Sequence, residues 1–119
     1  MNFFAIGAVS GALVVMLGAF GAHGLKDILD DYSRSVYEKA VLYQMFHTIM
    51  IILLGVMDKV QPQINLYWAG LSFLLGIILF SGSLYLLAIT GLKWLGAITP
   101  IGGLFFILGW SIIFWKLNN

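Results

Sequence analysis

The side chains best able to do chemistry lie inside long apolar stretches of this sequence. His47 follows Tyr43 by four residues and Gln44 by three, so all three project from one face of a helix. Ala40 and Ile51 share that face. Because polar side chains in hydrocarbon are costly unless they have partners, this face must point towards other helices.

Among the ionisable residues, His47 has the greatest predicted depth in the membrane. It stands about ten residues into its helix, which corresponds to a depth on the order of 15 Å in a membrane. Hydrocarbon disfavours the charged imidazolium, so we expect a neutral ring with one donor and one acceptor nitrogen. The candidate partners are a neighbouring carbonyl or the hydroxyls of Ser10, Ser81, Ser83 and Thr99. Two interpretations stay open: an interhelical hydrogen bond that fixes packing, or a proton relay or ligand contact.

Catalytic and metal-binding constellations are not expected. His23 ends the first apolar stretch, roughly 15 Å in depth from His47 if both helices are straight, and no third suitable ligand stands near both. No serine occupies a Gly-x-Ser-x-Gly elbow, no intramembrane carboxylate can orient a histidine, and the sequence has no cysteine. We therefore expect no enzymatic activity, no catalytic residue, no metal and no cofactor.

The composition indicates that these residues are carried by membrane-spanning helices. Of the 119 residues, 61% are hydrophobic and 9% are charged, whereas an ordinary soluble domain is roughly one-quarter charged. Helices are required, because an open strand would leave backbone groups unpaired in lipid. The uncharged stretches predict four spans, at about Phe3–His23, Val36–Met57, Tyr67–Ile89 and Leu95–Trp115. The predicted fold class is an all-α membrane protein, a four-helix bundle in a single domain over residues 1–119.

The first loop carries most of the charge. Seven of the eleven charged residues lie between Lys26 and Lys39. Apolar residues recur between them at helical spacing: Leu25, Ile28, Leu29, Tyr32 and Val36. This pattern favours a short amphipathic helix on the membrane surface, with a plain solvated loop as the alternative. The loop's charges sum to −1, so anionic lipid is not expected to hold it strongly. Ser35 and Glu38 form a capping box that would start the second helix.

Lysine and arginine counts give the predicted orientation. Four cations flank the first and third loops, at Lys26, Arg34, Lys39 and Lys93, and two lie on the other side, at Lys59 and Lys116. The positive-inside rule places loops one and three in the cytoplasm and both termini outside. The aromatic belts would then be Tyr67, Trp68 and Trp115 on one side and Tyr32, Tyr37 and Trp94 on the other. The net charge of +1, without a cationic cluster, argues against nucleic acid as a partner.

Small residues predict where helices approach one another. The first span has Gly7 and Gly11 in a G-x-x-x-G motif, followed by Gly18, and the last span has Gly102 and Gly103. These positions serve packing within the bundle or, alternatively, self-association. Pro100 either starts the last helix late or kinks it.

Five groups of residues carry a resemblance to a known family. They are residues 18–25 (GAFGAHGL), Tyr43-Gln44 with His47, residues 80–85 (FSGSLY), residues 99–103 (TPIGG) and Gly109-Trp110. In order and spacing the chain resembles domain-of-unknown-function family 423, small bacterial membrane proteins related to a eukaryotic four-span family. The resemblance implies a four-helix protein of the bacterial cytoplasmic membrane and carries no activity with it.

The resemblance singles out residues that could form one polar seam from the cytoplasmic interface to the bundle centre. They are His23, Gln44, His47, Ser81, Ser83, Tyr85, Thr99 and Pro100. The resulting expectation is a non-enzymatic module in the lipid bilayer, whose seam stabilises the bundle or binds a small or lipidic ligand or a membrane partner. The alternative is a small transporter or channel subunit that works as an oligomer.

Overall fold

The computed structural model describes residues 1–118, and its regular elements are all helical in this range. The elements are α1 (Phe3–His23), α2 (Asp31–Val60), α3 (Tyr67–Gly76), the π-helical η1 (Ile77–Ser81), α4 (Gly82–Thr90), the 3₁₀-helical η2 (Lys93–Ala97) and α5 (Thr99–Leu117). Since α3, η1 and α4 are continuous, and η2 leads into α5, residues 1–118 form four helices long and apolar enough to cross a membrane. The predicted all-α, four-span fold is confirmed.

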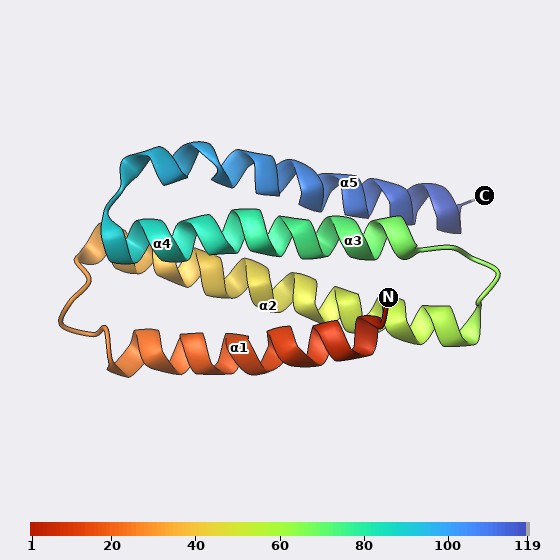
Figure 1. Ribbon diagram of the computed structural model, residues 1–119, viewed down its shortest axis with the longest axis horizontal. Helices are drawn as coiled ribbons and strands as arrows, with labels where there is room; N and C mark the ends of the chain where they lie inside the picture. The colour runs from red at the N-terminus through yellow and green to blue at the C-terminus, as the bar shows by residue number, and fades with distance from the viewer. Residues whose placement is uncertain (119) are drawn as a thin grey trace.

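The helices pack mainly against their neighbours in sequence. Helix α1 packs chiefly against α2, α2 packs against the rod formed by α3, η1 and α4, and α5 packs against the other side of that rod. Figure 1 shows α1 and α5 at opposite edges of the molecule, which measures 49 × 26 × 19 Å. Loops one and three lie at one end, and loop two and both termini lie at the other (Figure 1).

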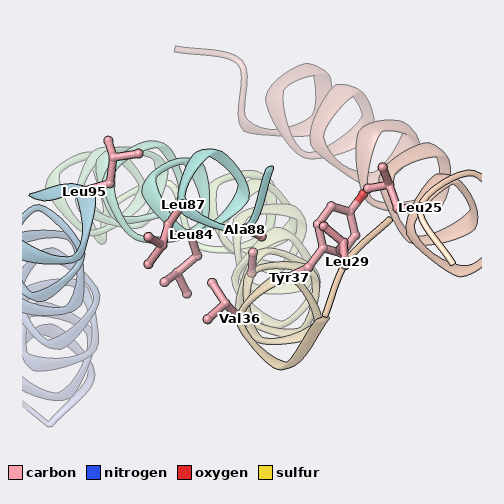
Figure 2. Close-up of a cluster of buried hydrophobic side chains, with 9 residues drawn as sticks. Leu25, Leu29, Val36, Tyr37, Leu84, Leu87, Ala88 and Leu95 are labelled. Carbon is pink, nitrogen blue, oxygen red and sulfur yellow. The ribbon is translucent and has the colours of Figure 1, made fainter. Parts of the chain in front are cut away.

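Two apolar clusters hold this arrangement together. The cluster at the end near the termini contains Phe3, Ile51, Leu54, Leu66, Ala69, Phe73, Ile77 and Phe106. The cluster at the end of loops one and three contains Leu25, Leu29, Val36, Tyr37, Ala40, Leu84, Leu87, Ala88 and Leu95 (Figure 2). In the first cluster the ring of Phe3 lies against Gly70, where an added Cβ would come within 2.1 Å of it. The N-terminal end of α1 is thereby anchored to α3.

The first loop differs from the predicted amphipathic helix. Residues 24–28 form turns and Leu29 forms a bend; in this segment Leu25 and Leu29 are buried while Ile28 is 73% exposed. Helix α2 begins at Asp31, and the N-cap is Asp30, whose carboxylate accepts the Ser33 amide at 2.7 Å. The expected Ser35 cap is therefore wrong. The side chain of Asp30 caps the first free backbone amides of α2, so the helix begins before Ser35. The segment before it folds into turns that bury Leu25 and Leu29.

The third and fourth spans both deviate from regular α-helix. The stretch around Ser81 contains the π-helical turn η1, in which the Gly82 amide donates to the Ile77 carbonyl. In the last span η2 precedes α5, and Pro100 stands in the first turn of α5, where its missing N–H costs nothing. Pro100 thus marks a late helix start.

At some glycines a neighbouring helix comes too close for a side chain, and at others there is room for one. A Cβ on Gly7 would come 2.5 Å from the side chain of Ile52, and one on Gly102 would come 2.3 Å from the backbone nitrogen of Phe80. The corresponding distances at Gly11, Gly18 and Gly103 are 3.7 to 3.8 Å, which is ordinary contact. The backbones of α5 and η1 are therefore in direct contact at Gly102.

Candidate functional site

Gln44 is the centre of a hydrogen-bonded group that joins three helices. Its amide Nε2 donates to the Ser10 hydroxyl at 3.2 Å and to the Ser10 carbonyl at 3.4 Å. Its Oε1 accepts from the Tyr85 hydroxyl at 2.7 Å, and Ser10 in turn shares a 2.6 Å hydrogen bond with Thr48. Gln44 is only 4% exposed, and both ends of its amide have partners. The group therefore ties α1 and α4 to α2 in a buried setting where each bond also avoids a desolvation cost.

His47 lies one turn further along α2, with a partner on each ring nitrogen. Nδ1 lies 2.8 Å from the Tyr43 carbonyl, and Nε2 lies 3.1 Å from the indole nitrogen of Trp110. A carbonyl only accepts and an indole N–H only donates. Nδ1 must therefore carry the proton while the lone pair of Nε2 accepts, so the two partners select one neutral tautomer.

Aromatic rings enclose this imidazole. The ring of Phe106 is stacked on it, with a centroid distance of 3.6 Å and an interplanar angle of 7°. Phe46 and Phe73 flank it at 5.2 and 5.3 Å. His47 is 3% exposed. The ring is thus packed on its faces and hydrogen-bonded at its edges.

The serines of the third span satisfy backbone groups around the π turn. The Ser81 hydroxyl donates to the Ala40 carbonyl on α2 at 2.7 Å. The Ser83 hydroxyl lies 3.0 Å from the Phe80 carbonyl and 2.6 Å from the Thr99 hydroxyl. The Phe80 carbonyl belongs to the π turn, where hydroxyls commonly satisfy backbone groups of an irregular membrane helix, whereas the Ala40 carbonyl lies within the regular helix α2. Here the hydroxyls also join the third span to α2 and to the start of α5.

The structure divides the predicted seam into separate groups. Gln44 is bonded to Ser10, Ser83 to Thr99, and His47 to Trp110 rather than to any of the expected hydroxyls. Of the expected partners of His47, the neighbouring carbonyl is the one found.

The remaining predicted residues stand apart from these groups. Tyr43 is 40% exposed; its carbonyl serves His47 while its ring lies 4.5 Å from that of Phe80. His23 is exposed at the end of α1 beside loop one.

Tyr85, which the resemblance singles out, completes the hydrogen bonds of Gln44. Three other residues of these contacts were not among the predicted site residues. Trp110 and Thr48 complete the hydrogen bonds of His47 and Ser10. Tyr37, expected in an interfacial aromatic belt, is 3% exposed and donates its hydroxyl to the Leu17 carbonyl. The available signal was chemical: an indole or phenol in the middle of a span needs a polar partner.

Within residues 1–118, every buried side-chain nitrogen and oxygen has a hydrogen-bond partner. In the same range no three His, Cys, Asp or Glu side chains are grouped so that they could hold a metal ion. The arrangement is able to fix helices relative to one another.

Comparison with known proteins identifies relatives across nearly the whole chain. Residues 17–103 match the model of the family described as "Protein of unknown function (DUF423)". A UPF0382 membrane protein of Staphylococcus haemolyticus is 51% identical over 111 residues, covering 93% of this chain and 90% of that protein. Proteins of the same name from Staphylococcus epidermidis and a bovine strain of Staphylococcus aureus are each 48% identical with the same coverage. No solved structure matches the chain. With its four apolar helices and relatives that are membrane proteins, the chain belongs to the DUF423 family of multi-pass membrane proteins.

Proposed function

We propose that this protein is a non-enzymatic membrane module whose buried polar groups lock four helices into one fixed arrangement. The observation that carries the proposal is His47, whose two ring nitrogens are both used by protein groups. A proton relay or transport site needs a lone pair or N–H that can be released to water or ligand. In this arrangement, protonation of Nε2 would set one N–H donor against the N–H of Trp110.

The other polar groups support the same role. The amide of Gln44 and the hydroxyl of Ser81 bind groups on other helices, and none of these contacts needs a ligand. A single interhelical hydrogen bond in a membrane contributes about 0.6 kcal/mol on average. Several such bonds, together with the stacking on His47, favour one set of helix positions over its alternatives.

The test is the nitrogen chemical shifts of His47 in lipid bilayers. We expect the spectrum of a neutral ring protonated at Nδ1, unchanged between about pH 5 and 8, the range over which an ordinary histidine changes charge. The exposed His23 serves as the internal control. In Trp110→Phe, which keeps an aromatic ring but removes the indole N–H, the Nε2 signal should shift.

One result would replace this proposal with another function. If His47 becomes protonated in this pH range while the helices stay folded, water reaches the ring. The small transporter or channel subunit, working as an oligomer, would then be the better explanation. If Trp110→Phe leaves the Nε2 signal unchanged, the hydrogen bond from Trp110 to His47 is refuted, and with it the use of both ring nitrogens by protein groups.

The proposed location is the bacterial cytoplasmic membrane, with loops one and three in the cytoplasm. Four of the six lysines and arginines flank these two loops, which is the asymmetry of the positive-inside rule. The sequence lacks cysteine, so single cysteines at the exposed positions Asp27 and Gln63 can be labelled selectively in intact cells. We expect an impermeant thiol reagent to label Gln63→Cys and not Asp27→Cys. The reverse labelling pattern would show that the orientation in the membrane is the opposite of the one proposed.

The proposed partner of this module is the lipid bilayer. A second copy of the chain or a larger membrane protein is proposed as a further partner. The exposed faces of α1 and α5 are apolar, as shown by Val15 at 70% and Leu104 at 65% exposure. Such faces suit lipid and other apolar helices alike.

A further inference from the structure

A cleft opens between the C-terminal half of α1 and the beginning of α2, away from the buried polar groups. Its volume is about 630 Å³, within the range of sites that hold small molecules. The rim next to loop one is polar, with His23, Lys26, Arg34 and Glu38. The wall further along α2 is apolar and includes Val41, Leu42 and Met45. The cleft is therefore amphipathic along its length.

The cleft follows from the way in which α1 is held. Tyr37 reaches from α2 to α1, as Figure 2 shows, and donates its hydroxyl to the Leu17 carbonyl. A Cβ on Gly21 would come 2.2 Å from the Tyr37 ring, so the two helices touch at this point. Beside the contact, Gly18 and Ala22 present no large side chain. The small residues that permit the contact also leave the adjacent space unfilled.

The charges on the rim differ from those of the loop as a whole. Lys26 and Arg34 line the cleft with one carboxylate, Glu38, and the guanidinium of Arg34 is placed by a 2.7 Å hydrogen bond to the Lys26 carbonyl. Asp27, Asp30 and Asp31 are not among the lining residues, and Asp30 is engaged as the cap of α2. The rim thus has two cations and one carboxylate, whereas the charges of the whole first loop, on which the expectation of weak binding to anionic lipid rests, sum to −1.

We propose that the cleft binds one anionic phospholipid. Lys26 and Arg34 bind the phosphodiester, Glu38 accepts a hydrogen bond from a hydroxyl of the headgroup, and one acyl chain lies along Val41, Leu42 and Met45. Position supports this occupant, because the polar rim lies where α1 and α2 leave the apolar region and the wall continues into it. The proposal concerns a surface separate from the His47 and Gln44 contacts and does not depend on their role.

The test measures phosphatidylglycerol bound to the purified full chain in detergent micelles, by native mass spectrometry with phosphatidylcholine as competitor. We expect one phosphatidylglycerol to bind in preference to phosphatidylcholine. Each cation near a lipid surface contributes about fivefold in affinity, so Lys26→Gln and Arg34→Gln should each weaken binding about fivefold. Lys39→Gln and Lys93→Gln remove cations from the same end of the molecule outside the cleft and should leave binding unchanged.

Two further variants separate binding from folding. Arg34→Lys keeps the charge and should retain most of the affinity, whereas a loss as large as in Arg34→Gln would overturn the charge argument. Ala22→Phe should fill the cleft and abolish selective binding, while Ala19→Phe, also exposed on α1 but not lining the cleft, should not. Equal binding of the two lipids, equal effects of the two phenylalanine variants, or competition by glycerol 3-phosphate without acyl chains would each refute the proposal.

Discussion

Gly102 offers a sharp test of the packing between α5 and the third span. At this position an added Cβ would lie 2.3 Å from the backbone nitrogen of Phe80 and 2.7 Å from its Cα. A backbone cannot rotate out of the way as a side chain can. Accommodating the methyl group of Gly102→Ala therefore requires α5 and η1 to separate by about 1 Å, since ordinary contacts begin near 3.4 Å.

Two opposing effects set the magnitude. Overpacking of this kind costs about 1 to 3 kcal/mol. Alanine is favoured over glycine in a helix by about 1 kcal/mol, which offsets part of that cost. The neighbouring Gly103 stands in the same helical turn, but its Cβ would lie 3.8 Å from the Phe80 ring, so Gly103→Ala gains the helix preference without the clash. We expect Gly102→Ala to be less stable than Gly103→Ala by about 1 to 3 kcal/mol.

The assay is reversible unfolding of the two variants and the parent chain in mixed micelles, followed by helical circular dichroism. Gly102→Ala should unfold at lower denaturant than Gly103→Ala, and Gly103→Ala at the same concentration as the parent or higher. Because both substitutions add the same methyl group to the same helix, their difference isolates the contact with Phe80. Equal stability of the two variants would refute the close approach of these backbones.

Two other substitutions test the edges of the fold. Gly11→Leu should lower the melting temperature in detergent more than Leu13→Ala. A methyl group fits at Gly11, 3.7 Å from Thr48, but the rest of a leucine side chain does not, whereas Leu13 is 41% exposed. Equal melting temperatures would mean that α1 does not pack on α2 at Gly11. Asp30→Ala should destabilise the start of α2 and Asp27→Ala should not. The backbone hydrogen bond from Ser33 holds the pKa of Asp30 below its usual value, so this contribution is present above the unfolded pKa and is lost as pH falls through the folded one. Melting curves near pH 6 and pH 3 check this, and a pH-independent difference between the two variants would contradict it.

The helices were predictable from sequence because lipid imposes a simple rule. A stretch of about 20 uncharged residues has few alternatives to a helix when water cannot satisfy its backbone. The first loop was less predictable, because water can satisfy its backbone groups and a helix is therefore not required there. There Leu25 and Leu29 have helical spacing, but turns also bury both of them, and Asp30 competes with Ser35 as the cap.

The partners of the buried polar residues were the hardest to predict. That Gln44 and His47 face inward follows from helical spacing and the cost of exposing them to lipid. Their partners depend on how far each neighbouring helix is shifted along its axis, which one sequence does not specify. Trp110 is 63 residues from His47, and Tyr85 is 41 from Gln44. Long side chains add to the difficulty, because an indole or phenol reaches groups that lie a turn away.

The distribution of satisfied and exposed polar groups indicates where ligand chemistry is to be sought in this chain. Inside the bundle, across residues 1–118, each buried polar side-chain atom already has a protein partner, so an added ligand would have to break an existing hydrogen bond. At the end of loop one, Lys26 and Arg34 line an open cleft whose wall is apolar. A ligand there would gain contacts without displacing any. The α1–α2 cleft is therefore a better place than His47 to look for binding, and variation at its rim should change binding with little effect on the fold.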